Sequence, residues 1–329
     1  MAPQAMSPMG RMDAGLRRLM RVADALTALH LLPTPERFLQ RPPAKRVGPK
    51  LPAFIAGKMP PGIGIVEREV DTPSGPLGLR VYGPPAGGDP LPGLLYLHGG
   101  GWVGGAARLT DNICARLAAR ARVRVVSVDY RLAPESPFPG PLDDATAGLR
   151  WMADHADELG IDPTALGVAG DSAGGNLAAA LAIRARDEDL PTLRFQALIY
   201  PVLDGTLSTP AMLSYDGPGL TPADMRLYYE AYGGTHDRTL PLLSPLHVAS
   251  AAGLPDAVIV TAGFDCLPDE GLLYAEKLNA AGVPAEHLHV PDAPHGFFSL
   301  PGLCSKAAAA YEVVGRAIEH ALHPLPLQS

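Results

Sequence analysis

One serine stands in a pattern typical of a catalytic nucleophile. Ser172 lies in the sequence Gly-Asp-Ser-Ala-Gly, residues 170–174, between an apolar run at 165–169 and a helical pattern from about 173. A strand, a sharp turn and a helix in this order lift a serine hydroxyl above a sheet edge. The amino terminus of the helix favours the negative charge that develops during attack on a carbonyl. The pattern predicts a nucleophile; a simple small-residue turn is the alternative.

A glycine-rich loop precedes this serine in the chain. The sequence His-Gly-Gly-Gly-Trp, residues 98–102, follows an apolar run at 94–97. Three consecutive glycines lose much conformational entropy on folding. Their presence therefore indicates a role that requires glycine, such as close approach of the backbone to a ligand. Its N–H groups, with that of Ala173, predict an oxyanion hole facing Ser172. Phosphate binding is the weaker alternative because no Lys-Ser/Thr follows the glycines.

A serine nucleophile also needs a general base and a group that orients the base. Of ten histidines, His98 and His295 begin or lie on loops after predicted strands, and His98 is expected to order the glycine loop. His295, in Pro-Asp-Ala-Pro-His-Gly-Phe at 291–297, is therefore the candidate base. Asp265 likewise follows the predicted strand at 257–261. The chain order Ser172, Asp265, His295 is one of the known orders of a catalytic triad.

Four further acids stand near predicted helix starts. Asp269 and Glu270 open one helix, and Asp143 and Asp144 open another. Carboxylates in the first turn of a helix are favoured by its dipole. We therefore expect these four acids to cap helices rather than to take part in catalysis.

The elements that must position these residues alternate along the chain from residue 93. Strand patterns alternating with helices predict a mainly parallel sheet with helices on both faces, and sites in such sheets lie at the carboxyl ends of the strands. Two earlier strand patterns, joined by a turn, predict a hairpin. The predicted strands are 63–70, 77–82, 94–97, 123–128, 165–169, 197–200, 257–261 and 287–290; the predicted helices are near 107–121, 143–158, 173–187, 270–281 and 305–321.

Three segments do not fit this alternation. Residues 12–32 have a helical apolar period interrupted by charges, which excludes a signal-peptide core. Residues 33–62 are rich in proline and predict an extended crossing segment. Residues 204–241 are turn-rich and then helical at 222–232. An insertion over the carboxyl edge of the sheet, joined by the N-terminal helix, would form a cap.

The composition of the 329 residues excludes several classes of protein. An apolar fraction of 47% and a charged fraction of 19% argue against a disordered chain. A net charge of −7 argues against a nucleic-acid binder, and no apolar stretch is long enough to predict a membrane span. Three widely spaced cysteines fit neither a disulfide framework nor a zinc site, so we expect a cytoplasmic protein.

The chain resembles the hormone-sensitive-lipase-like bacterial carboxylesterases of the α/β-hydrolase fold. The matching segments are HGGGW (98–102), DYRLAPE (129–135), PFPGPLDDA (137–145), GDSAGGN (170–176), DCLPDEG (265–271) and HGF (295–297). The resemblance implies a mostly parallel central sheet flanked by helices. It also implies a cap from residues 1–50 and an insertion at 204–235, over a catalytic domain of 51–203 and 236–329.

The same resemblance implies a serine carboxylesterase that hydrolyses short- to medium-chain acyl esters through an acyl-enzyme intermediate, without metal or cofactor. It assigns the triad to Ser172, Asp265 and His295. The resemblance suggests two kinds of partner: a small-molecule ester as substrate, and a second copy of the chain in a homodimer through the last strand and helix. The implied oxyanion donors are Gly100, Gly101 and Ala173.

Two questions stay open at this level. Trp102 and Tyr228, with Tyr229 and Tyr232, are candidates to line the substrate pocket, but packing within the cap would explain them equally well. Amide hydrolysis by the same triad is the main alternative activity. A ligand-binding protein on an inactive hydrolase scaffold is disfavoured because the base His295 is present.

Overall fold

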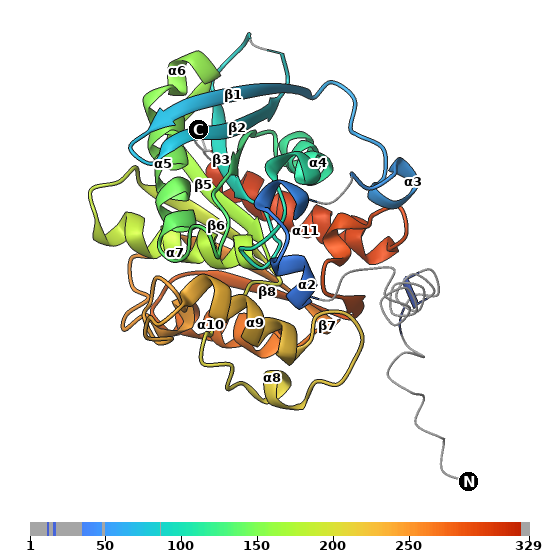
Figure 1. The fold of residues 1–329 in the computed structure, drawn as a ribbon. Helices are drawn as coiled ribbons and strands as arrows, with labels where there is room; N and C mark the ends of the chain where they lie inside the picture. The colour runs from blue at the N-terminus through green and yellow to red at the C-terminus, as the bar shows by residue number, and fades with distance from the viewer. Residues whose placement is uncertain (1–11, 13–15, 18–34, 48–49, 86, 324–329) are drawn as a thin grey trace.

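The computed structural model describes residues 12, 16–17, 35–47, 50–85 and 87–323 (Figure 1). The helix predicted at 12–32 therefore lies outside the described residues, apart from Met12, Leu16 and Arg17. In the part of the chain that is described, no helix is both long and apolar enough to cross a membrane.

Apolar runs of the sequence form one sheet of eight strands within the described residues, in the order β1-β2-β4-β3-β5-β6-β7-β8. β1 pairs antiparallel with β2, and β2 with β4, whereas all later neighbours are parallel. The predicted hairpin and the predicted parallel sheet are both confirmed. The strands are β1 (Gly64–Thr72), β2 (Gly75–Gly83), β3 (Leu91–Leu97), β4 (Arg124–Asp129), β5 (Ile161–Asp171), β6 (Leu193–Ile199), β7 (Asp256–Phe264) and β8 (Ala285–Pro294).

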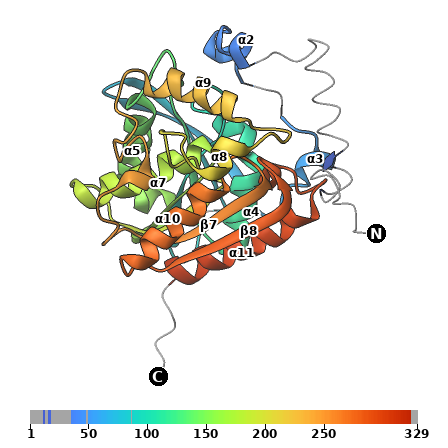
Figure 2. The same cartoon turned by 90° about the horizontal axis from the view of Figure 1, so that it is seen from below.

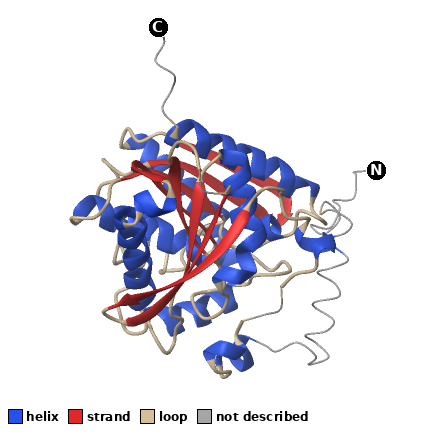
Figure 3. Ribbon diagram, turned by 90° about the horizontal axis from the view of Figure 1, so that it is seen from above, coloured by secondary structure: helices blue, strands red, loops and turns tan. Residues whose placement is uncertain are grey.

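Helices cover both faces of this sheet (Figure 3). α4 and α11 pack against one face, where Ile113 and Val314 share a core with Val125 of β4. The helices α5, α7 and α10 pack against the other face, and Figure 2 shows α11 and α10 on opposite sides of β7 and β8. The helices are α4 (Asp111–Ala121), α5 (Gly140–Asp154), α6 (Ala156–Leu159), α7 (Ala173–Asp187), α10 (Pro268–Ala280) and α11 (Ser305–Leu322).

The connection from β6 to β7 carries the helices α8 (Pro210–Ser214) and α9 (Pro222–Gly233). The helix predicted at 222–232 is therefore confirmed. Thr221 and Asp224 form a capping box at the start of α9, which fixes where this helix begins.

The sequence predicts that the Pro-rich stretch at 33–62 is extended, and this prediction is wrong for part of it. It contains the short helices α2 (Pro35–Leu39), η2 (Pro43–Lys45) and α3 (Ala53–Ala56). Proline suits the first turn of a helix because that N–H needs no partner there. Arg46 fastens this stretch to the body: its buried guanidinium donates to Ala133 O and pairs with Glu135.

Candidate active site

The three residues predicted to form a triad meet at the carboxyl ends of β5, β7 and β8. His295 Nε2 lies 2.8 Å from Ser172 Oγ, and His295 Nδ1 lies 2.6 Å from Asp265 Oδ2. The side chain of Asp265 is buried, and its other oxygen accepts the N–H of Leu267 at 3.2 Å. This chain of hydrogen bonds can remove a proton from the serine hydroxyl and stabilise the imidazolium that results.

The turn that carries Ser172 leaves room only for glycine at the positions two residues before and two residues after it. Ser172 has φ 55° and ψ −120°, a strained conformation between β5 and α7. A Cβ at Gly170 would lie 2.2 Å from the carbonyl oxygen of Gly174, and one at Gly174 would lie 2.0 Å from that of Leu97. The strain and the close packing together hold the hydroxyl above the sheet edge.

The glycine loop after β3 presents its backbone to the same place. Gly100 and Gly101 line the cavity beside Ser172, with φ values of +127° and +62° that glycine adopts readily. The N–H groups of Gly100, Gly101 and Ala173 donate to no acceptor among the described residues. These three donors are therefore available to an oxyanion on the substrate.

Buried polar contacts fix the base of this loop. Asp171 accepts hydrogen bonds from Tyr96 Oη at 2.6 Å and from the N–H of Gly99 at 3.1 Å, and burial raises the pKa of its carboxyl group. His98 stacks on Tyr130 at a centroid distance of 4.1 Å, and burial lowers the pKa of its imidazole. These hydrogen bonds and the ring stack tie the start of the glycine loop to β3, to β5 and to Tyr130.

A cavity of about 320 Å³ opens beside the serine. Tyr228, predicted as a pocket residue, lines it, and burial raises the pKa of this tyrosine to about 12. Phe38 from α2, Leu220 from the β6–β7 connection and Tyr200 after β6 line it as well. The sequence offered no signal for these three, because their side chains reach the cavity only through tertiary packing.

Trp102, the other predicted pocket residue, does not line this cavity. Its side chain is fully buried and stacks on Tyr232 at 4.4 Å between ring centroids, with Tyr229 at 5.0 Å. The aromatic cluster of Trp102, Tyr229 and Tyr232 therefore joins the glycine loop to α9 by packing. Of the four aromatic candidates, only Tyr228 reaches the site.

The prediction that the four acids near helix starts cap those helices is wrong for Asp144, which lies beyond the first turn of α5, and for Glu270 only its place in the first turn of α10 is confirmed. Glu270 is fully buried, and its Oε2 accepts the N–H groups of Leu203 and Asp204 in the loop after β6. Burial raises the pKa of Glu270 well above its ordinary value. Asp144 forms a bidentate ion pair with Arg131 instead of capping α5. Both carboxylates bind groups from other parts of the fold, Glu270 the loop after β6 and Asp144 the side chain of Arg131, instead of the N–H groups of their own helices.

The other two acids also bind beyond their own helices. Asp269 accepts the N–H of Ala211 at 2.7 Å, and Asp143 pairs with Arg184 at 2.8 Å. Within the described residues, no group of three or more histidine, cysteine, aspartate or glutamate side chains is placed to hold a metal ion.

Comparison with known proteins agrees with this geometry. Residues 94–299 match the family described as alpha/beta hydrolase fold. The chain belongs to this family. The hydrolase is 40% identical over 255 residues to "Esterase LipI" of Mycobacterium tuberculosis, which covers 76% of this chain and 80% of that protein. The resemblance to hormone-sensitive-lipase-like carboxylesterases that the motifs indicated is confirmed.

Two longer matches extend the comparison. The hydrolase is 36% identical over 294 residues to "Ethyl acetate hydrolase" of Pseudomonas putida, covering 88% of this chain and 92% of that protein. The crystal structure of an alpha/beta hydrolase from the metagenome of Lake Arreo, Spain, superposes with a TM-score of 0.84 at 34% identity. That match covers 94% of this chain and 98% of the other.

Proposed function

We propose that this protein is a serine carboxylesterase in which Ser172, His295 and Asp265 form the catalytic triad. Membership of the carboxylic ester hydrolases follows from its relatives; the roles of individual residues are our assignment. The observation that carries the assignment is the pair of hydrogen bonds at 2.8 Å and 2.6 Å that joins the three side chains at one cavity.

The first half of the reaction forms an acyl-enzyme. His295 Nε2 takes the proton of Ser172 as Oγ attacks the ester carbonyl, and Asp265 stabilises the imidazolium. The carbonyl oxygen becomes an oxyanion that accepts the N–H groups of Gly100, Gly101 and Ala173. One such donor is worth about 10²–10³ in rate. The first half ends when the tetrahedral intermediate collapses: His295 gives its proton to the departing alkoxide, and the acyl-enzyme is left.

The second half releases the acid. A water molecule takes the place of the departed alcohol. The same imidazole removes a proton from that water as it attacks the acyl carbonyl, and the collapse of the second tetrahedral intermediate restores Ser172.

The substrate class that we propose is esters of short- to medium-chain acids. The cavity of about 320 Å³ is bounded by Phe38, Leu220 and Tyr228, which limit the length of chain that it accepts. The relative from Pseudomonas putida is named for the hydrolysis of ethyl acetate, an ester of a short acid.

We assign these bounding residues to a cap made of residues 1–50 and 204–235, over a catalytic domain of 51–203 and 236–329. Contact between α2 and α9 supports a joint cap. A homodimer through β8 and α11 is proposed as well, because β8 is an edge strand of the sheet; light scattering tests it. A cytoplasmic location stays a prediction.

The decisive experiment is a series of p-nitrophenyl esters from acetate to laurate, hydrolysed by the wild type and by Ser172→Ala. We expect kcat/KM to peak among the shorter acyl chains and to fall by about 10⁴-fold or more in Ser172→Ala. An acyl anilide of the preferred acid separates esterase from amidase activity. Serine-independent turnover of every ester would refute the assignment.

A further inference from the structure

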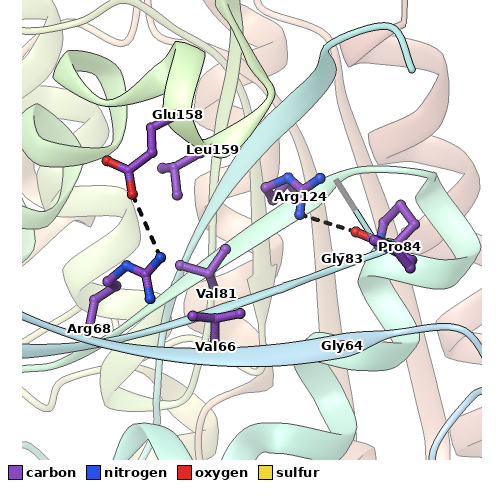
Figure 4. A pocket seen from close by; sticks show the side chains of 10 residues that line it. Gly64, Val66, Arg68, Val81, Gly83, Pro84, Arg124, Glu158 and Leu159 are labelled. Carbon is purple, nitrogen blue, oxygen red and sulfur yellow. Dashed lines mark hydrogen bonds and ion pairs between the residues drawn. The ribbon is translucent and has the colours of Figure 1, made fainter. Parts of the chain in front are cut away.

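A second cavity lies at the other end of the sheet from Ser172. It has a volume of about 220 Å³ and is bounded by β1, β2, the start of β4 and α6 (Figure 4). Arg124, the first residue of β4, is in register with Gly93 of β3, which in turn is in register with Leu166 of β5. Leu166 precedes Ser172 by six residues, so the two cavities are about 20 Å apart along the strands.

Arg124 is one of two arginines that line this second cavity. Its Nη1 donates to the carbonyl oxygen of Pro84 at 3.4 Å, a weak contact. Its Nε is buried and has no hydrogen-bond partner, and no carboxylate among the described residues comes within 4.0 Å of the guanidinium. Burial lowers the pKa of Arg124, because the guanidinium loses hydration and gains no nearby negative charge in return.

Other arginines of the chain show what this guanidinium lacks. Arg131 binds Asp144 through Nε and Nη2 together, at 2.9 Å from each nitrogen. Arg80 binds Asp111 through the same two nitrogens, at 2.9 Å and 3.3 Å. This side of a guanidinium matches a carboxylate with two parallel hydrogen bonds. In Arg124, neither nitrogen has an acceptor among the described residues.

The rest of the cavity wall is largely apolar. Val66, Val81 and Leu159 lie between Arg124 and the ion pair of Arg68 with Glu158, as Figure 4 shows. Arg68 is thus already matched to a carboxylate, at 3.6 Å. One unmatched positive charge beside a hydrocarbon surface suits a singly charged ligand with an apolar chain. The nearby carboxylate of Glu158 disfavours a doubly charged anion.

The backbone around Arg124 is shaped to admit its side chain. A Cβ at Gly83 would lie 2.7 Å from Arg124 Nη1, so glycine at the end of β2 makes room for the guanidinium. We propose that the cavity at Arg124 binds a small monocarboxylate, which accepts a hydrogen bond from Nη2, the nitrogen that is not fully buried, while its short hydrocarbon chain packs against Val66, Val81 and Leu159. This site is independent of the triad assignment.

Calorimetric titration with butyrate tests the proposal, with butyramide as the neutral isostere and inorganic phosphate as the polar anion. The wild type is compared with Arg124→Gln and Arg194→Gln. Arg194 is an exposed residue of β6, also near the amino end of its strand, so it controls for the change in net charge. Any butyrate bound beside Ser172 contributes equally to all three proteins.

We expect Arg124→Gln to weaken one class of butyrate site by about tenfold or more, since a hydrogen bond between two charged groups is lost. Arg194→Gln should bind as the wild type does, and butyramide should not bind at this site. Equal butyrate binding by Arg124→Gln and wild type would overturn the proposal. Tighter binding of phosphate or equal binding of butyramide would do so as well.

A second variant locates the site without removing the cation. Val66→Trp fills the cavity from β1, where an exposed edge strand tolerates an aromatic residue. We expect it to weaken butyrate binding as much as Arg124→Gln does, with an unchanged circular dichroism spectrum. Unimpaired butyrate binding by Val66→Trp would place the ligand elsewhere and refute the assigned cavity.

Discussion

The two ends of the parallel strands differ in how their buried ionisable groups are hydrogen-bonded. At the carboxyl end, Asp171, Asp265 and Glu270 are buried, and each accepts hydrogen bonds from the protein. At the amino end, the Nε and Nη2 of Arg124 have no acceptor among the described residues. An ionisable group that is hydrogen-bonded by the protein is held in place and can orient a reaction. A group without a partner in the protein is able to bind a solute.

The largest expected effect tests the carboxyl end. Asp265→Asn should lower kcat by about 10⁴-fold, because an amide no longer holds the tautomer of His295 or stabilises its charged form. Ester hydrolysis by the purified variant measures it. Asp269→Asn is the control, since this neighbouring acid binds Ala211 N and not His295. A comparable loss in Asp269→Asn would contradict the assigned orienting residue.

The next effect tests the rigidity of the glycine loop. In Gly100→Ala, the new Cβ would lie 2.3 Å from the carbonyl oxygen of Gly104, so the loop must move and kcat/KM should fall by about 10²–10³. Gly87→Ala is a matched control: its φ of +131° resembles the +127° of Gly100, but no atom lies within 4 Å of its Cβ.

Steady-state kinetics of both variants distinguish loop geometry from general backbone strain. Gly87→Ala should keep the wild-type kcat/KM although it is strained in the same way. If both substitutions lower activity alike, the contact between Gly100 and Gly104 is not what positions the oxyanion donors.

Stability measurements compare the two ends directly. Arg131→Gln leaves the buried carboxylate of Asp144 without its cation and should cost about 3 kcal/mol in the free energy of unfolding. Arg124→Gln removes a cation that pairs with no carboxylate of the described residues, and should change this free energy by less than about 1 kcal/mol. Urea titration of both variants gives the two values. Equal losses would mean that the fold compensates Arg124 too.

The smallest effect is a pH dependence at Glu270. Burial raises its pKa in the folded state above the ordinary value of 4.5, so the folded chain binds this proton more tightly than the unfolded chain does. The resulting stability is complete below pH 4.5 and is lost as the pH rises through the folded pKa.

Glu270→Gln removes this dependence. The melting temperature of the variant, relative to that of the wild type, should therefore increase as the pH rises from about 5 to about 8. The slope is at most about 1.4 kcal/mol per pH unit. Glu276→Gln, an exposed change on the same helix, should track the wild type. A constant difference between Glu270→Gln and wild type would show that Glu270 does not retain its proton.

Local patterns predicted the strands, the main helices and the three residues that meet at the site. Those features depend on short-range constraints: hydrophobic periodicity, glycines beside Ser172, and loops after strands that carry Asp265 and His295. One failure is local, the short helices in the Pro-rich stretch 33–62. The other failures concern long-range partners. Glu270 binds the backbone of Leu203 and Asp204, and Trp102 packs in the aromatic cluster instead of lining the cavity.

The sequence by itself determined the order and type of the chemical groups, because motifs specify turns and side chains locally. Only the tertiary structure decided which buried charges are compensated. Asp144 and Arg131 are thirteen residues apart in the sequence, and their side chains meet across a loop. Within the part of the chain that the structure describes, no carboxylate pairs with Arg124. Compensation depends on the distances between groups from separate strands and helices, and those distances exist only once the sheet has assembled.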